Sequence, residues 1–338
     1  MGDAQGGFVR ALVTGGGGFL GSAIVRRVVD RGWKVRTLQR GSYQELENLG
    51  AEQVQGDIAD RDVVSTAVDG IDIVFHVAAK VDPWGAYPPF HRTNVIGTSN
   101  VLAAMRAHGV PKLVFTSTPS VVHSGGDLAG VDESQPYPGH FEAAYPQTKA
   151  MAEMEVLAAN DQTLSTVALR PRLIWGPGDT NLVPQLVARA RSGELRFVGD
   201  GSNLVDTVYI DNAVDAHMLA ADRLEPGAAC AGRAYFITNG EPWPIREVIN
   251  GILSAAGVPP VESSVPYGAA IVAGALFESI HRIFPSEDGP RMTRFIARNF
   301  AATSWFDISA ARRDLGYEPR VSIDEGLSRL KGWFNGQS

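Results

Sequence analysis

The chain is poor in the residues that crosslink or anchor proteins. Its 338 residues include a single cysteine, Cys230, so no internal disulfide can form, and no Cys or His pairs have the spacing of a zinc site. No apolar run reaches the roughly 20 residues that a transmembrane helix requires. We therefore expect a soluble protein without a structural metal.

Two further absences concern location and partners. The segment Met1–Arg10 has no basic patch leading into an apolar region, so a secretory signal is not expected and the cytoplasm is the expected compartment. The formal net charge is −7, and the sequence has no concentrated basic surface of the kind that phosphate binding requires. Nucleic acid is therefore not an expected partner.

What the sequence does contain is an alternation of short apolar runs with longer segments of helical periodicity. Hydrophobic residues make up 44% of the chain and charged residues 20%, as in globular proteins. The apolar runs predict strands at Ala11–Thr14, Lys34–Leu38, Ile73–Val77, Leu113–Thr116 and Thr166–Leu169. The periodic segments predict helices at Ser22–Arg31, Val95–His108 and Ala150–Asn160. This alternation indicates an α/β fold with a doubly wound parallel sheet, the Rossmann arrangement.

The regular alternation fades after Arg170, where Pro and Gly become frequent. We expect a sheet domain over residues 8–174, rejoined by later strands near 205–212 and 234–240, and a smaller substrate-binding lobe over 175–335. The nearly all-apolar stretch Tyr267–Phe277 would form a helix of about three turns, too short to span a bilayer. A buried core helix is the preferred interpretation, and a substrate channel or a membrane-facing patch are the alternatives.

Three glycines, Gly15, Gly18 and Gly21, recur at intervals of three between the first strand and the first helix. Glycine permits a tight turn, lets the backbone approach a pyrophosphate and allows close packing of helix and strand. The helix N-terminus adds amide donors and a positive dipole for the phosphates. Dinucleotide binding by this turn, including Phe19 and Leu20, is favoured over an ordinary flexible turn.

The end of the second strand bears on the choice between NAD and NADP. An NAD-specific site places Asp or Glu there to bind the ribose hydroxyls, whereas this chain has Gln39 followed by Arg40. An arginine can pair with the 2′-phosphate of NADP. NADP(H) is therefore the expected cofactor and NAD the less favoured one. The alternative is that Arg36 or Arg40 is simply solvated.

Two other segments are candidates for cofactor contact. Asp57 and Ile58 follow Gly56, where a carboxylate can lie near the adenine, and a surface turn is the alternative. Ala78 and Ala79 end a strand and are small enough to let the cofactor lie close, and simple packing is the alternative.

Tyr145 and Lys149 are four residues apart and therefore lie on one face of a helix. An isolated tyrosine ionises at about pH 10, and a nearby ammonium group lowers that pKa. Tyr145 can then exchange a proton with a carbon–oxygen centre, while Lys149 also holds the nicotinamide ribose. A tyrosine and a lysine often occur at this spacing by chance, so the pair alone does not indicate a catalytic site. Thr118, or less favourably Ser117, adds to it, because it lies at a strand end where it can orient a substrate oxygen.

A set of motifs occurs in a fixed order over nearly the whole chain. They are Thr14-Gly-x-x-Gly-x-x-Gly21, Gly56-Asp57, Asn94-Val-x-Gly97, Thr116-Ser-Thr118, Tyr145-x-x-x-Lys149, Arg170-Pro171 and Gly176-Pro-Gly178. This set resembles the extended short-chain dehydrogenase/reductase family. The resemblance implies a catalytic triad of Thr118, Tyr145 and Lys149, an active-site position for Asn94, a nicotinamide pocket lined from Pro171 onward, and a homodimer.

Three segments narrow the resemblance. They are Thr116-Ser-Thr-Pro-Ser-Val121, Arg170-Pro-Arg-Leu-Ile-Trp-Gly-Pro-Gly-Asp179 and Tyr235-Phe-Ile-Thr-Asn-Gly-Glu-Pro242. They are similar to the 3β-hydroxysteroid dehydrogenase-like branch, and within it to the reductases of 2-alkyl-3-oxo fatty acids in bacterial long-chain olefin biosynthesis. This implies NADPH-dependent reduction of the 3-oxo group with Tyr145 as proton donor, and assembly with other olefin-pathway enzymes. A 3β-hydroxysteroid or sterol dehydrogenase is the alternative.

Two other classes are less favoured. Nucleotide-sugar epimerases and dehydratases of this family typically have an arginine facing the substrate diphosphate, at the position where this chain has Val205. A buried dianion without that partner would be costly. A non-catalytic NADP-binding protein would usually lack Tyr145 or Lys149, and both are present.

The expected substrate is thus an apolar small molecule, a 2-alkyl-3-oxo fatty acid or a sterol. Trp84 and Trp175 are candidates to surround its alkyl chains or rings, and core packing is the alternative for both. Lys80 is a candidate partner for a substrate carboxylate, although a solvated lysine is the favoured interpretation.

Overall fold

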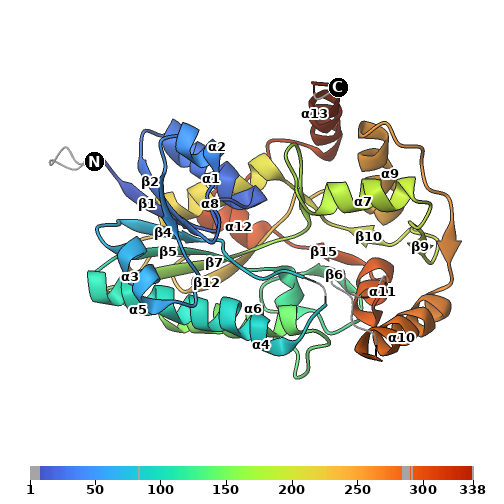
Figure 1. Cartoon of the computed structure of the whole chain (residues 1–338), viewed down its shortest axis with the longest axis horizontal. Coiled ribbons are helices and arrows are strands. Elements are labelled where there is room, and N and C mark those ends of the chain that lie inside the picture. Colours follow the sequence, from blue (N-terminus) through green and yellow to red (C-terminus); the bar gives the residue numbers. More distant parts are fainter. Residues whose placement is uncertain (1–7, 83, 284–289, 291, 337–338) are drawn as a thin grey trace.

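A parallel sheet of seven strands forms the centre of the computed structural model, which describes residues 8–82, 84–283, 290 and 292–336 (Figure 1). The strand order is β12-β7-β5-β4-β1-β2-β3. The strands are β1 (Arg10–Thr14), β2 (Lys34–Gln39), β3 (Glu52–Gln55), β4 (Ile73–His76), β5 (Lys112–Thr116), β7 (Ser165–Pro171) and β12 (Arg233–Ile237). The five predicted strands and the predicted doubly wound sheet are confirmed.

Helices cover both faces of this sheet (Figure 1). One face carries α1 (Phe19–Asp30), α8 (Ile210–Arg223) and α12 (Ser309–Leu315). The other carries α3 (Arg61–Val68), α5 (Gly97–His108) and α6 (Ala144–Ala158). Shorter elements are α2 (Gln44–Asn48), α4 (Tyr87–Phe90), a π-helical segment (His91–Ile96) that runs into α5, and a 3-10 turn (Pro119–Val122). The three predicted helices correspond to α1, α5 and α6.

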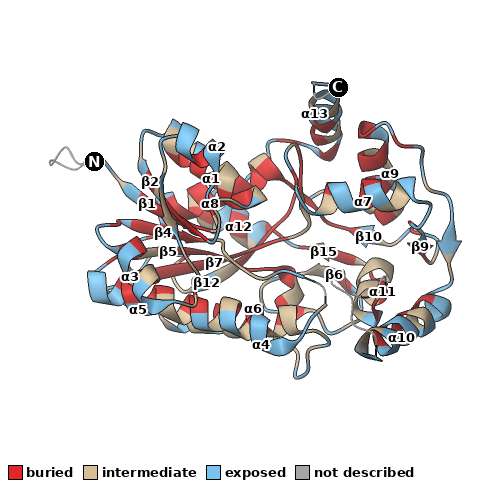
Figure 2. Ribbon diagram, viewed as in Figure 1, coloured by how far each residue is buried: buried red, intermediate tan, exposed pale blue. Residues whose placement is uncertain are grey.

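Alternation along the strands divides the hydrophobic core between the two faces. On β1, Val13 joins the cluster under α1 and α8, while Leu12 joins the cluster under α3 and α5. Phe75 and Val74 of β4 divide in the same way. Figure 2 shows the resulting buried strands between helices whose outer faces are exposed. Because both faces are covered, the strands are almost continuously apolar.

A second lobe lies beside the sheet domain (Figure 1). Its four-stranded sheet has the order β13-β10-β15-β6, and the strand pairs β8–β11 and β9–β14 lie nearby. These strands are β6 (Leu128–Val131), β8 (Ile174–Trp175), β9 (Phe197–Val198), β10 (Leu204–Val205), β11 (Val208–Tyr209), β13 (Trp243–Pro244), β14 (Ser264–Val265) and β15 (Ser304–Phe306). Its helices are α7 (Leu182–Arg191), α9 (Ile245–Ala255), α10 (Tyr267–Ile283), α11 (Arg294–Ala301) and α13 (Ile323–Gly336).

One of the two segments predicted to rejoin the main sheet does so. The segment near 234–240 supplies β12, which pairs with β7. The segment 205–212 does not, because Val205 pairs with Trp243 and Ser304, and Tyr209 pairs with Trp175 beyond the end of β7. The chain instead returns to the sheet as α8, which packs on β5 and β7.

The prediction of a buried core helix at Tyr267–Phe277 is wrong. This stretch begins α10, a 17-residue helix on which Val272 and Leu276 are 69% and 58% exposed. The helix packs against α11, where a Cβ on Gly274 would lie 2.8 Å from the backbone nitrogen of Arg294. Its other face has no covering element among the described residues. Within those residues, no helix has both the length and the apolarity needed to cross a membrane.

A buried ion pair joins α6 to β7. The Arg170 guanidinium donates to both Glu153 carboxylate oxygens, at 2.6 Å to Oε1 and 3.0 Å to Oε2, and the hydroxyl of Tyr137 donates to Oε1 at 2.6 Å. The Arg170 and Glu153 side chains are 4% and 0% exposed. Helix α6 carries Tyr145 and Lys149, and β7 ends at Pro171. The ion pair therefore fixes the position of α6 relative to the end of β7.

We predict that Glu153→Gln lowers the free energy of unfolding by about 3 kcal/mol or more, because Arg170 would remain as an uncompensated buried charge. Urea denaturation measures the change. The matched control is Glu325→Gln, which breaks an exposed pair with Arg329 and should cost less than about 1 kcal/mol. Equal losses in the two variants would contradict the role of the buried pair.

Candidate active site

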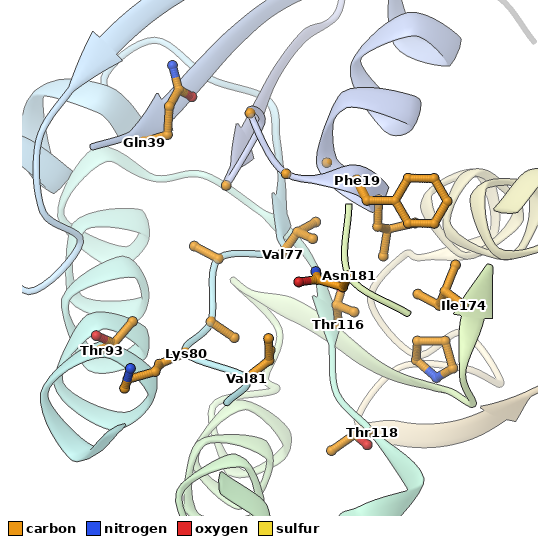
Figure 3. Close-up of a pocket in the computed structure, with 18 of the residues that line it drawn as sticks. Phe19, Gln39, Val77, Lys80, Val81, Thr93, Thr116, Thr118, Ile174 and Asn181 are labelled. Atoms are coloured by element: carbon orange, nitrogen blue, oxygen red, sulfur yellow. The ribbon is translucent and has the colours of Figure 1, made fainter. Parts of the chain in front are cut away.

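A cavity of about 700 Å³ opens at the carboxyl ends of the central strands (Figure 3). It lies where the strand order reverses between β1 and β4, the position at which open α/β sheets bind ligands. In Figure 3, Gln39 lies at one end of the cavity and Thr118 at the other. Most of the predicted cofactor residues line it: Gly15, Gly18, Phe19, Leu20, Gly21, Arg40, Asp57, Ile58, Ala78, Ala79 and Pro171.

The glycine turn leaves no room for side chains at two positions. Gly15 has φ +72° and its backbone approaches Ala78, where a Cβ on Gly15 would lie 2.9 Å from the Ala78 Cα. A Cβ on Gly21 would overlap the Gly15 carbonyl oxygen and lie 2.8 Å from its carbonyl carbon. The turn therefore brings bare backbone and the first amides of α1 to the cavity, which suits a pyrophosphate.

The ends of β1 and β4 are tied together by Thr14 and His76. The Thr14 hydroxyl accepts from the backbone nitrogens of Val77 and Ala78, each at 3.1 Å, and lies 2.7 Å from Nδ1 of His76. Burial lowers the pKa of His76 to about 3, so this imidazole stays neutral. These bonds hold the small residues after β4 in place along the cavity floor.

Gln39 and Arg40 lie at the end of β2, as predicted. The amide nitrogen of Gln39 donates to Gln53 at 3.1 Å, while its buried oxygen has no partner among the described residues. Arg40 is exposed at the cavity edge and likewise has no partner there. Arg36, the other candidate, is turned away and donates to the carbonyls of Ala67 and Asp69 at 3.0 and 2.7 Å.

Asp57 and Ile58 border the same end of the cavity. One oxygen of Asp57 accepts from the Ala59 nitrogen at 2.9 Å, and the other pairs with Arg92 at 2.9 Å. Ile58 is buried against Gly97 at the start of α5, where a Cβ on Gly97 would clash with the Ile58 side chain. The turn after β3 is therefore held rigidly beside the cavity.

Tyr145 and Thr118 meet at the opposite end of the cavity. Burial raises the pKa of Tyr145, and a hydrogen bond with Thr118 and the charge of Arg172 act against that rise. Thr118 also accepts from the Ser120 nitrogen at 3.2 Å, which fixes its hydroxyl. The less favoured candidate, Ser117, lines the same cavity with a buried hydroxyl that has no partner in the described part of the chain.

Lys149 lies one turn after Tyr145 on α6 and is buried. Its ammonium donates to the carbonyl oxygen of Thr116 at 2.7 Å and lies 4.0 Å from the ring centre of Phe115. Burial lowers the pKa of Lys149 to about 7, and the Glu153 carboxylate opposes this shift. The charge of Arg172, a residue that the sequence analysis missed, favours the phenolate of Tyr145.

Asn94 and Lys80 form a support for the loop after β4. The Lys80 nitrogen donates to the Asn94 side chain at 2.7 Å, and the Asn94 amide donates to the Lys80 carbonyl at 3.1 Å and to Thr148 at 3.0 Å. Asn94 is buried in the π-helical segment and does not line the cavity. Lys80 does line it, but its ammonium pairs with Asp82 and lies 5.1 Å from the ring centre of Phe90.

A second cavity of about 840 Å³ adjoins the first and shares Asp82 and Tyr145 with it. Aromatic side chains are frequent in its lining: Trp84, Tyr87, Phe90, Phe141 and Phe295. Trp84 thus lies where an apolar substrate can reach it. Trp175 does not, because it is fully buried in the core and its indole donates to Thr207 at 3.0 Å.

The profile of the 3-beta hydroxysteroid dehydrogenase/isomerase family matches residues 12–266. The chain belongs to this family. A 2-alkyl-3-oxoalkanoate reductase of Stenotrophomonas maltophilia is 54% identical over 96% of this chain and 98% of its own length. A second protein of that name, from Shewanella oneidensis, is 48% identical over 95% of this chain and 85% of its own length.

Among solved structures, MoeE5 in complex with UDP-glucose and NAD superimposes with a TM-score of 0.75 at 25% identity, covering 97% of this chain and 99% of that one. The family is NAD(P)-dependent, and the chain is an oxidoreductase of the extended short-chain dehydrogenase/reductase class.

We predict that Gly21→Ala abolishes measurable dinucleotide binding, because its Cβ would displace the turn through the Gly15 carbonyl. Isothermal titration with NADPH and with NADH provides the measurement. Gly332→Ala is the matched control, since Gly332 lies in α13 with nothing within 4 Å of its added Cβ. Unchanged affinity in Gly21→Ala would refute the assignment of this turn to the pyrophosphate.

Proposed function

We propose that this chain catalyses the NADPH-dependent reduction of the 3-oxo group of a 2-alkyl-3-oxoalkanoate to the 3-hydroxy acid. The observation that carries the proposal is the position of Tyr145, which lines both the cavity beside the glycine turn and the aromatic cavity next to it. The relative that is 54% identical and bears the name of such a reductase supports the choice of substrate.

Each active-site side chain has a distinct task in this reaction. NADPH, when bound, supplies the hydride that is added to C3. Tyr145 donates its proton to the oxygen of C3, and Thr118, through its hydrogen bond with Tyr145, orients that oxygen. Because burial raises the pKa of Tyr145, the phenol is protonated at neutral pH and ready to act as the acid. Lys149 would hold the nicotinamide ribose and supply positive charge below its pKa of about 7.

The lining of the two cavities supports this division between cofactor and substrate. Bare glycine backbone, the unpartnered oxygen of Gln39 and the free guanidinium of Arg40 fit a dinucleotide along the first cavity. The aromatic residues of the second cavity suit long alkyl chains. They would also suit sterol rings, so a 3β-hydroxysteroid remains the second candidate substrate, in keeping with the family. A cytoplasmic location is a further proposal. A homodimer and association with other olefin-pathway enzymes are proposals that the resemblance alone supports.

We expect Tyr145→Phe to lower kcat for a 2-alkyl-3-oxo acid by about 100-fold or more, because it removes the general acid. The initial rate of NADPH oxidation is the measurement, and it is made with the 2-alkyl-3-oxo acid and, for comparison, with a 3-oxosteroid. Tyr267→Phe, on the exposed start of α10, is the control and should leave the rate unchanged. Equal turnover by Tyr145→Phe and the wild-type chain would eliminate the proposed mechanism.

We expect Arg40→Asp to shift the cofactor preference towards NADH by at least tenfold in kcat/KM, since the 2′-phosphate loses its cationic partner and a carboxylate can bind ribose hydroxyls. The ratio of the rates with NADPH and NADH tests this. Arg36→Gln removes the neighbouring arginine, which is bonded to carbonyls of the α3 region, and should leave the ratio unchanged. An unaltered ratio in Arg40→Asp would show that Arg40 does not bind the phosphate.

A further inference from the structure

Arg172 is a cation at the Tyr145 end of the first cavity that forms no ion pair with the described residues. It directly follows Pro171, where β7 ends, and its side chain lines the cavity. Its Nε is buried and has no hydrogen-bond partner, and among the described residues no carboxylate forms an ion pair with the guanidinium. A buried donor that lacks an acceptor is costly, and an anion from outside the chain could supply one at this cavity.

Asp206 is the carboxylate whose charge acts on Arg172. Asp206 accepts from the Phe306 nitrogen at 2.8 Å through Oδ2, and burial raises its pKa to about 6. Asp206 and Arg172 influence each other's charge but make no hydrogen bond. Asp206 therefore stabilises the cation without occupying its donors.

The other cations near Tyr145 do have partners. Lys80 pairs with Asp82 in the first cavity. In the second cavity, Arg294 pairs with Glu278 at 2.8 Å and Arg298 pairs with Glu142. Of the described lysines and arginines that line the two cavities at the Tyr145 end, Arg172 is thus the one without an ion-pair partner, and its donors remain available for a ligand.

The backbone beside Arg172 is held in an unfavourable conformation. Leu173, the next residue, also lines the cavity and has φ 42°, the one positive φ at a described residue other than glycine. A leucine in this region is strained, and such strain is concentrated at ligand sites. Arg172 thus lies directly beside a strained residue in the cavity lining.

We propose that Arg172 binds the carboxylate of the 3-oxo acid and makes the site selective for acids over neutral ketones. This inference rests on the proposed function and specifies how the substrate is recognised. In a 3-oxo acid the carboxylate is separated from C3 by a single carbon, so an oxygen at Tyr145 places the carboxylate within reach of a neighbouring group. A guanidinium offers two parallel donors to a carboxylate, which fixes both position and orientation.

The assignment has a consequence for neutral substrates. A ketone, an ester or a sterol would lie against the guanidinium without supplying a negative charge or a pair of carboxylate oxygens, and the site would discriminate against it. Arg172 also favours the phenolate form of Tyr145, so its removal affects every substrate to some extent. A test must therefore compare an acid with its neutral analogue in the same variant.

The test uses the reverse reaction, in which a 2-alkyl-3-hydroxy acid and its methyl ester are oxidised with NADP⁺ by the full chain. We expect the wild-type chain to prefer the acid, and Arg172→Gln to lower the acid-to-ester ratio of kcat/KM by about 30-fold or more. Arg172→Lys keeps the charge but loses the paired donors, and should give an intermediate ratio. Arg191→Gln, at the exposed end of α7, is the control and should keep the wild-type ratio.

The outcomes separate this inference from the proposed function. If the wild-type chain oxidises neither the acid nor its ester, the proposed function fails. If it oxidises the acid and Arg172→Gln and Arg172→Lys lose activity equally on acid and ester, carboxylate binding by Arg172 is refuted. The same conclusion follows if Lys80→Met, rather than Arg172→Gln, removes the preference for the acid. Thermal denaturation verifies folding, and Arg172→Lys serves as the test variant if Arg172→Gln does not fold.

Discussion

The buried pair of Arg170 and Glu153 is the interaction on which the active site depends. Tyr145, Lys149 and Glu153 recur every four residues on one face of α6, so anchoring Glu153 to β7 also fixes the positions of the Tyr145 and Lys149 side chains. The same pair fixes the end of β7, from which the chain continues into Arg172. An ion pair without access to water holds this geometry because moving either partner alone would leave a charge uncompensated.

Burial then determines the protonation states that the chemistry uses. It raises the pKa of Tyr145 and lowers that of Lys149 to about 7. The Tyr145 phenol is therefore kept protonated, while Lys149 titrates near neutral pH. Burial also keeps His76 neutral, which lets it serve as a hydrogen-bond partner for Thr14 beneath the cavity. One physical effect, the exclusion of water from the carboxyl edge of the sheet, thus sets the protonation states of several groups at once.

Local patterns in the sequence predicted the elements that depend on short-range geometry, and they failed where burial is decided by distant partners. The strand β3, with the sequence Glu-Gln-Val-Gln, was not predicted because a strand at the sheet edge needs few apolar residues. Trp175 was a candidate for substrate contact but lies in the core. The stretch Tyr267–Phe277 was predicted to lie in the core but forms part of α10, on which Val272 and Leu276 are exposed. The hydrophobicity of a residue gives the free energy that its burial would contribute, but the packing of other segments decides whether it is buried.

By itself, the sequence determined the glycine turn, the Tyr145–Lys149 pair and the strand that ends at Thr116, because each depends on residues a few positions apart and on the periods of helix and strand. The family followed from the order of these motifs. The tertiary structure alone decided that the charge of Arg172 acts on Tyr145, that Asn94 supports the Lys80 loop, and that two cavities meet at one phenol. Thr118 follows β5, Tyr145 lies in α6 and Arg172 follows β7, and long-range packing brings the three within reach of one another.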